Sequence, residues 1–346
     1  MKKLSLFMIF CACSLMFALP ATVVQSAEVL ANNPDEPSWV WPLAPEKPRV
    51  RHIKTFITPQ DLGVTKGFFA KVWEFIAGED TVDHIYSPHG IVADGLGKVY
   101  VVDWGAGKIH YFNFEKKKYD QFGTTKEGEL VSPIGAALDA DGRLYVTDSA
   151  LRRVFVYSGT KNKLVIGGDD TFLRPTGIAV NKKEKILYVV DTLGHRVDLF
   201  ELTGKKRGSF GRQGTEEGEF NYPTHLAIDG AGDVYVMDTL NFRVQIFDKT
   251  GKFLAQFGSN GTAIGDFMKP KGIAVDSEGH IWVSDGLRNS IQVFDRDGRL
   301  LLIFGREGIG RGEFNIPAGL YIDANDRLYV SDSYNYRVQI LQYLKQ

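Results

Sequence analysis

Residues 223–258 read PTHLAIDGAGDVYVMDTLNFRVQIFDKTGKFLAQFG. The stretch contains four short runs rich in Val, Ile and Phe, which are HLAID, DVYVMD, RVQIFD and FLAQF. Such runs predict β-strands. The segments between them, GAG, TLNF and KTGK, carry the Gly, Asn and Asp that favour tight turns. Because connections this short join neighbouring strands antiparallel, the stretch predicts one four-stranded sheet.

This stretch is one copy of a sixfold repeat. Each copy opens with a proline and an apolar strand, and the six prolines are Pro88, Pro133, Pro175, Pro223, Pro270 and Pro317. They lie 45, 42, 48, 47 and 47 residues apart. A period of this length indicates a repeat architecture in which neighbouring units share a core. The sequence therefore predicts an all-β fold, a six-bladed β-propeller.

The second strand of every copy ends in an aspartate, and these are Asp103, Asp148, Asp191, Asp238, Asp285 and Asp332. A catalytic carboxylate is needed once or twice in a protein, whereas a turn needs a capping carboxylate in every blade. We therefore interpret the six aspartates as acceptors of backbone N–H groups in the adjoining turns, with arginines that include Arg243 and Arg337 nearby.

The middle of the repeat resembles the NHL repeat, whose pattern is tyrosine-valine-x-aspartate, then asparagine, then arginine-valine-glutamine. Residues 235–245 (YVMDTLNFRVQ) and 329–339 (YVSDSYNYRVQ) carry this pattern in full. The second and third copies keep the arginine and lose the asparagine, while Lys108 and Ser290 replace the arginine in the first and fifth. The resemblance covers about residues 88–346 and implies the propeller fold, which hosts many unrelated functions.

The last copy ends after three strands, at Gln346. Residues 49–58 (RVRHIKTFIT) look like a strand that has no neighbour in the sequence. We predict that they supply the missing outer strand of the last blade and so close the ring. The propeller domain would then span residues 49–346.

A helical insertion is expected at about residues 65–78, before the first full blade. Its spacing gathers an aromatic patch made of Phe68, Phe69, Trp73, Phe75 and Ile76. A structural role, in which the patch covers one end of the ring, is one interpretation. The others are a partner-docking surface, a lid over the central pocket and a membrane-surface helix.

The first 26 residues have the form of a secretory signal peptide, with Lys2 and Lys3 ahead of an apolar run. Cleavage would remove Cys11 and Cys13, which are the only cysteines, and export to the periplasm or cell exterior is expected. Retention of the segment as an anchor, or lipid attachment at Cys13, would instead hold the protein at a membrane. Residues 27–48 read as a proline-rich linker, and no later segment reads as a transmembrane span.

The net charge and the absence of common catalytic motifs limit the kinds of partner that the sequence predicts. The formal net charge is −1, so bulk charge gives no indication of binding to nucleic acid or to an anionic membrane. The sequence also lacks a glycine-x-serine-x-glycine elbow, an HExxH motif, a phosphate loop and a CxxC pair. We therefore expect a protein, peptide or glycan partner and no nucleic acid.

Departures from the repeat mark a candidate ligand site at one mouth of the central channel. His89 follows the first proline, and His225 stands where the other five copies have glycine. Since the first and fourth blades of a six-bladed ring are opposite, the two imidazoles are expected to face each other. Arg174 and Lys271 add positive charge at the same mouth. Trp104, Phe242, Tyr334 and Tyr336 lie on turns that could form an aromatic rim for docking.

Residues 88–91 (PHGI) are similar to a segment of the peptidylglycine amidating lyase propeller, in which such a histidine binds zinc. That resemblance implies a metal site with His89 and His225 as ligands, but the family's site needs three histidines and no clear third is present. Lactonases of the gluconolactonase type share the fold and hold calcium with a carboxylate and amide cluster that cannot be placed here.

We expect no cofactor and a non-catalytic function, as an exported scaffold that binds its partner through one face. The alternative is a metal-dependent lyase or hydrolase at the channel mouth that uses zinc or calcium. A third class is a structural component of an envelope assembly, docked through residues 68–76.

Overall fold

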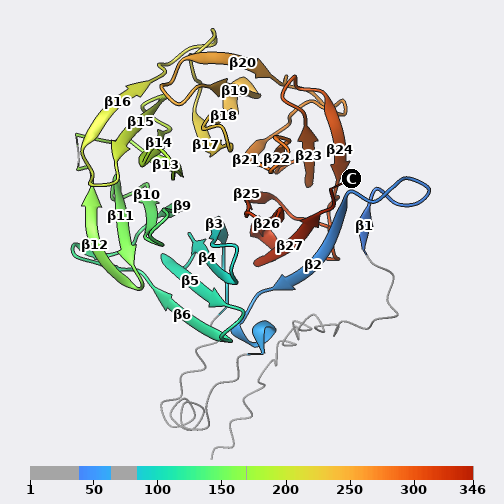
Figure 1. The fold of residues 1–346 in the computed structure, drawn as a ribbon, viewed down its shortest axis with the longest axis horizontal. Helices are drawn as coiled ribbons and strands as arrows, with labels where there is room; N and C mark the ends of the chain where they lie inside the picture. The colour runs from blue at the N-terminus through green and yellow to red at the C-terminus, as the bar shows by residue number, and fades with distance from the viewer. Residues whose placement is uncertain (1–38, 64–83, 169, 346) are drawn as a thin grey trace, which may run out of the picture. The chain divides into compact units, whose positions relative to one another are not determined.

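The structure is a computed structural model that describes residues 39–63, 84–168 and 170–345. Within these residues it is an all-β, six-bladed propeller (Figure 1). The expected signal peptide, most of the expected linker and the expected helix at about residues 65–78 lie outside the described residues, as do Phe68, Phe69, Trp73, Phe75 and Ile76.

Each of blades 1 to 5 is a sheet whose four strands follow the chain order from the inside outwards. Blade 1 contains β3 (Pro88–Ala93), β4 (Lys98–Asp103), β5 (Lys108–Asn113) and β6 (Lys118–Phe122). Blade 2 contains β9 (Pro133–Leu138), β10 (Leu144–Asp148), β11 (Arg153–Ser158) and β12 (Lys161–Ile166). Blade 3 contains β13 (Pro175–Asn181), β14 (Ile186–Asp191), β15 (Arg196–Glu201) and β16 (Lys206–Phe210).

The second half of the ring repeats this arrangement. Blade 4 contains β17 (Pro223–Ile228), β18 (Val234–Asp238), β19 (Arg243–Phe247) and β20 (Phe253–Phe257). Blade 5 contains β21 (Pro270–Val275), β22 (Ile281–Asp285), β23 (Ser290–Phe294) and β24 (Leu300–Phe304). Blade 6 contains β25 (Pro317–Ile322), β26 (Arg327–Asp332), β27 (Arg337–Tyr343), β2 (Val50–Phe56) and β1 (Val40–Trp41).

Short elements lie between the strands. The hairpin of β7 (Thr124–Thr125) and β8 (Gly128–Glu129) follows blade 1. Three short 3₁₀ helices are described, which are η1 (Pro59–Leu62), η2 (Thr239–Asn241) and η3 (Ser333–Asn335).

Blade 6 is assembled from two distant parts of the chain. Strand β2 pairs antiparallel with β27, from Val50 opposite Tyr343 to Phe56 opposite Val338. Strand β1 then pairs with β2, so residues 40–41 of the expected linker form a fifth strand. Trp41 packs on the core between blades 5 and 6, with its ring 5.6 Å from that of Phe304.

The core is divided into six apolar clusters, each of which lies between two neighbouring blades. The cluster between blades 6 and 1 includes Phe56, Ile91, Phe112, Tyr329 and Val338. Because both faces of each sheet are covered by a neighbour, the second strands are buried along most of their length. This matches the apolar runs that predicted them.

Candidate functional site

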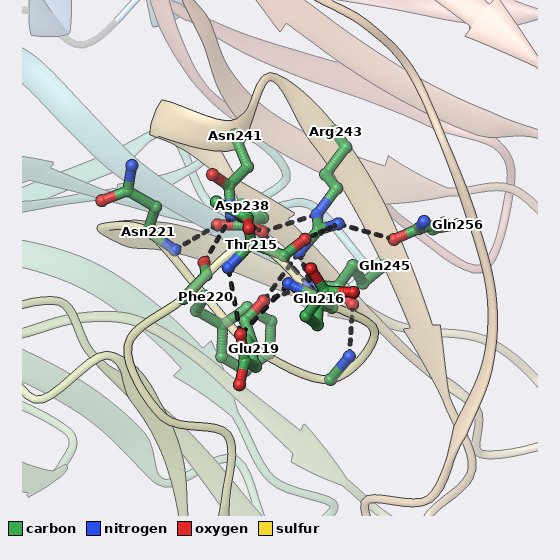
Figure 2. A network of polar contacts seen from close by, with 12 residues as sticks. Thr215, Glu216, Glu219, Phe220, Asn221, Asp238, Asn241, Arg243, Gln245 and Gln256 are labelled. Carbon is green, nitrogen blue, oxygen red and sulfur yellow. Dashed lines mark hydrogen bonds and ion pairs between the residues drawn. The ribbon is translucent and has the colours of Figure 1, made fainter.

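The aspartates at the ends of the second strands are structural. In blade 4 (Figure 2), Oδ1 of Asp238 accepts a hydrogen bond from the backbone N–H of Asn221 at 2.7 Å. Its Oδ2 accepts hydrogen bonds from Arg243 Nε at 2.8 Å and Asn241 Nδ2 at 2.8 Å. The carboxylate thus ties the segment before the first strand to the turn after the second. All six aspartates are completely buried and bond this preceding segment.

Arg243 extends this network to the loop that leads into its own blade. Its guanidinium donates to the backbone carbonyls of Thr215, Glu216 and Glu219 and to Gln256 Oε1, as Figure 2 shows. The sequence prediction of arginine beside aspartate is confirmed here and in blade 6, where Arg337 bonds Asp332 at 2.7 Å. The six buried carboxylates therefore hold turns together.

In blade 1 the buried aspartate is bonded by a histidine, which was not among the residues predicted to be important. His110 is buried in the position of Gln245, with Nε2 3.1 Å from Asp103 Oδ2 and Nδ1 2.8 Å from Tyr119 Oη. The signal was available, since His110 replaces the glutamine of the arginine-valine-glutamine pattern. Because both ring nitrogens are engaged inside the sheet, His110 supports the turn.

The hub is the space enclosed by the six first strands, β3, β9, β13, β17, β21 and β25 (Figure 1). The third residue of each of five of these strands is glycine: Gly90, Gly135, Gly177, Gly272 and Gly319. A Cβ at Gly90 would lie 2.4 Å from the carbonyl oxygen of Ile134, and one at Gly272 would lie 2.2 Å from that of Ala318. Neighbouring first strands therefore approach so closely that no side chain fits between them.

His225 occupies the sixth position of this glycine series. Its ring stacks on that of His89 from the opposite blade, with centroids 5.4 Å apart and planes 11° from parallel. The predicted meeting of the two histidines is what the structure shows. Nδ1 of His225 lies 3.1 Å from Thr224 Oγ1, while His225 Nε2 and His89 Nδ1 are buried and have no hydrogen-bond partner among the described residues.

The electrostatic surroundings of the histidine pair are cationic. Burial, together with Lys271 and Arg174, lowers the pKa of His89 to about 4, although a backbone hydrogen bond at Ile134 opposes the shift. Burial, His89 and Lys271 hold the pKa of His225 well below its usual value of 6.5. Burial and the neighbouring Lys269 lower the pKa of Lys271 to about 8. Both imidazoles are therefore neutral at pH 7, beside an ammonium group that is charged.

This arrangement fits a metal ion poorly. The lone pair of an imidazole nitrogen lies in the plane of its ring, so two nearly parallel stacked rings cannot direct their lone pairs at one ion without turning. Across the part of the chain that the structure describes, no three His, Cys, Asp or Glu side chains are grouped to hold a metal. The nearby Lys271 and Arg174 would also repel a cation.

Beyond the histidines, the channel contains an apolar cavity of about 450 Å³. All six first strands contribute to it, through residues that include Ile91, Ala136, Ile178, Leu226, Ile273 and Leu320. Each of these residues follows the glycine series, or His225, by one position in the chain, so the cavity lies along the later half of the strands. Most of its lining is apolar, and Asn181, Lys182, Lys183 and Asp229 add polar groups.

The face of the propeller where the first strands begin, here called the proline face, carries a ring of exposed apolar side chains. We define this apolar ring as Tyr86, Trp104, Val131, Leu173, Leu193, Tyr222, Leu240, Leu287 and Tyr334. Every blade contributes at least one member. Backbone hydrogen bonds such as Trp104 N–H to Ser87 O and Leu240 N–H to Asn221 O hold the two segments that carry these residues together.

Three of the four aromatic residues predicted for the rim are exposed. Trp104 is 52% exposed, Tyr334 59% and Tyr336 55%, whereas Phe242 packs against the core between blades 4 and 5. Arg174 is also exposed on this face and Lys271 is half-buried. Among the described residues, the three positions before each first strand and the turns after the second strands contain no acidic residue apart from the six buried aspartates. Glu129, Glu219, Asp266 and Glu313 stand one position further from the strand. The innermost part of the proline face is therefore apolar and cationic.

Comparison with known proteins identifies the repeat. Residues 267–294 and 314–341 match the NHL repeat family. Protein brain tumor of Drosophila melanogaster is 35% identical over 57 residues, which are 16% of this chain. The match spans only 5% of that protein's length. No helix among the described residues has the length and apolar character to cross a membrane.

Solved structures resemble this chain over about three quarters of its length. Virginiamycin B lyase from Staphylococcus aureus has a TM-score of 0.55 at 16% identity, over 75% of this chain and 95% of the lyase. A gluconolactonase from Xanthomonas campestris has a TM-score of 0.58 at 17% identity, over 75% of this chain and 87% of the lactonase. A Bacteroides thetaiotaomicron protein of unknown function has a TM-score of 0.60 at 19% identity, over 76% and 71% of the two chains. At these identities the likeness shows the fold alone, and the chain is a six-bladed β-propeller that carries NHL repeats.

Proposed function

We propose that this protein is a non-catalytic scaffold that binds a protein or peptide partner on its proline face. The observation that carries the proposal is the apolar ring, to which every blade contributes. Exposed apolar patches rimmed by polar groups mark interaction sites, and Trp and Tyr are enriched where binding energy concentrates. The ring contains Tyr86, Trp104, Tyr222 and Tyr334.

The charge of the inner proline face supports an acidic partner. Lys269, Lys271 and Arg174 lie on the segments that begin the first strands. Complementary charge speeds association and selects among partners. A partner segment that combines apolar side chains with carboxylates would satisfy both features of this face, and we favour it over a neutral glycan for that reason.

The test is partner capture with matched variants. The double variant Trp104→Ser/Leu240→Ser removes two exposed members of the apolar ring, while Leu301→Ser removes a side chain of similar exposure from the outer strand β24. We expect a set of acidic proteins that binds the wild type and the Leu301→Ser variant and is lost from the double variant. Equal capture by all three proteins would contradict the proposal.

A metal-dependent lyase or hydrolase at the hub is the second candidate. The observation that favours it is the pair of buried ring nitrogens without partners on His89 and His225. Metal analysis of the purified protein distinguishes the two candidates. Stoichiometric zinc or calcium that is lost in a His89→Ala variant would support the enzyme, and a metal-free wild-type protein whose partner capture depends on the apolar ring would support the scaffold.

We also propose that the chain is exported, because of its signal-peptide-like first 26 residues. Mass spectrometry of the protein recovered from the cell envelope tests this. A new N-terminus after Ser26 or Ala27 would support cleavage, and a lipid attached to Cys13 would support anchoring instead. Docking through residues 68–76, the basis of the envelope-assembly hypothesis, is a separate prediction that truncation of those residues would test.

A further inference from the structure

We propose that the hub is a carboxylate-binding site, formed by His89, His225 and Lys271. The inference rests on the proposed function, because it assigns the chemical group that the partner would place at the centre of the proline face. The histidine pair, the unpartnered ring nitrogens and the surrounding cations are three separate observations that point to it.

The first observation is that two ring nitrogens of the histidine pair are unpaired. His89 Nδ1 and His225 Nε2 are buried polar atoms without a hydrogen-bond partner among the described residues. A buried polar group that is left unpaired costs about 1–3 kcal/mol, so such atoms are normally satisfied by protein, water or a ligand. A neutral imidazole has one N–H group. His225 can carry it on the unpaired Nε2, which is the donor that a carboxylate oxygen needs. His89 uses its ring proton in the backbone hydrogen bond at Ile134, so a second N–H at Nδ1 requires protonation of the ring, which a bound carboxylate favours.

The repeat supplies a second argument, because it does not need His225. Five blades place glycine at this position and still build the same strands. The fourth blade instead directs an imidazole to the hub, where it stacks on His89 at 5.4 Å. The fold does not require this side chain, which ends in an unpaired polar atom and lies at the centre of the exposed face. A ligand therefore explains it better than packing does.

The charged groups near the histidine pair favour an anionic ligand. Lys271 acts on both histidines and Arg174 acts on His89, and every charged group that acts on the pair is cationic. Lys271 is half-buried and forms no ion pair with a carboxylate among the described residues. An anion placed here would compensate the unpaired ammonium and accept hydrogen bonds from the imidazoles.

The size of the site favours one small group. The glycine series brings the first strands into backbone contact immediately beside the histidines. A carboxylate presents two oxygens, which can meet a ring N–H and the Lys271 ammonium together. Such a group has two sources, which are a free organic acid and a carboxylate of the docked partner, and the experiment separates them.

The experiment follows the imidazole proton signals of the seven histidines by NMR. The wild-type protein is titrated at pH 7 with sodium acetate, with acetamide as the neutral control and sodium chloride at equal ionic strength. We expect saturable shifts of two histidine signals with acetate alone. The His225→Gly variant, which restores the glycine of the other blades, assigns one of those signals by its loss.

The Lys271→Met variant tests the role of the ammonium group. Met keeps an unbranched apolar stem of similar length and removes the charge, so we expect the acetate dissociation constant to rise at least about tenfold. The matched control Lys161→Met changes a lysine at the exposed start of β12, away from the hub, and should leave acetate binding unchanged. Shifts of equal size with acetamide, or no effect of Lys271→Met, would overturn the inference.

The source of the carboxylate is distinguished with N-acetyl-phenylalanine and its amide. Tighter binding of the free acid than of acetate, lost in the Trp104→Ser/Leu240→Ser variant, would assign the carboxylate to a docked partner. Equal binding of the two acids would indicate a free organic acid. If acetate fails to bind while partner capture still depends on the apolar ring, the carboxylate site is wrong and the scaffold stands.

Discussion

The imidazoles of His89 and His225 reach the hub from opposite blades and stack with their centroids 5.4 Å apart. Since burial and neighbouring cations keep both rings neutral, adding a proton to either ring places a charge beside Lys271 and beside the other ring. The pair therefore links the stability of the propeller to pH.

The first prediction follows from the lowered pKa of His89, about 4 against 6.5 in an unfolded chain. Between these pH values the unfolded state binds more protons, so the free energy of unfolding falls as the pH drops through this window and is fully retained above it. The loss from His89 should be about 2–3 kcal/mol between pH 7 and pH 4. His52, whose pKa is also about 4 because of burial, Arg311 and Arg337, adds to the loss.

Urea unfolding at a series of pH values measures this effect. The His225→Gly variant serves as the comparison, because it removes one of the two buried imidazoles whose pKa is lowered. Its free energy of unfolding should fall less steeply with decreasing pH than that of the wild type. Parallel curves for the two proteins would show that the hub does not titrate in this range.

The second prediction concerns the glycine series. Gly272→Ala would place a Cβ 2.2 Å from the carbonyl oxygen of Ala318, so the strands must separate. We expect a loss of about 1–3 kcal/mol or more. Gly230→Ala is the control, because a Cβ there would meet no atom within 4 Å and its φ lies outside the left-handed region, so it should change stability by less than about 1 kcal/mol. Thermal unfolding of both variants checks the difference.

The third prediction concerns the union of β2 with blade 6. Phe56 is completely buried and packs edge-on against Phe112 of blade 1, with ring centroids 4.8 Å apart. Phe56→Ala should cost about 3–5 kcal/mol through lost burial and the cavity left behind. Ile53, on the same strand, is 40% exposed, and Ile53→Ala should cost less than about 1 kcal/mol. Similar melting temperatures for the two variants would mean that β2 contributes little to the ring.

The fourth prediction concerns Arg243, which bonds one carboxylate, one side-chain amide and three backbone carbonyls. Lysine keeps the charge and cannot reach all of these acceptors, so Arg243→Lys should cost about 2–4 kcal/mol. Arg212 pairs with Glu219 while 81% of its side chain is exposed, and Arg212→Lys should cost less than about 0.5 kcal/mol. Chemical unfolding of both variants gives the comparison.

Periodicity in the sequence was sufficient to predict the fold. The spacing of the prolines and the apolar strands predicted six sheets, and the second strands ending in aspartate lie where expected. Opposition of His89 and His225 followed from counting blades. These features are local or repeat regularly, so the chain itself displays them.

Other features depend on contacts that no local pattern encodes. Residues 40–41 appeared to be part of a linker, because the pairing of β1 with β2 depends on neighbours in space. Phe242 was expected on an exposed rim, but it packs against the core between blades 4 and 5, a contact with the neighbouring blade that its own turn does not reveal. The role of His110 was not predicted, because it depends on hydrogen bonds to Asp103 and Tyr119 that the replacement of one glutamine does not reveal.

The pairing of β2 with β27 has a consequence for how the protein is made. The two strands are separated by all the other blades in the sequence, so Phe56 leaves the ribosome long before Val338 does. During that interval the edge of β2 that pairs with β27 has no native neighbour, and the apolar side chains of β2 cannot be buried in blade 6. The ring can therefore close only after its last strand, β27, has been synthesised. A chain that ends before residue 337 has no strand with which β2 can pair.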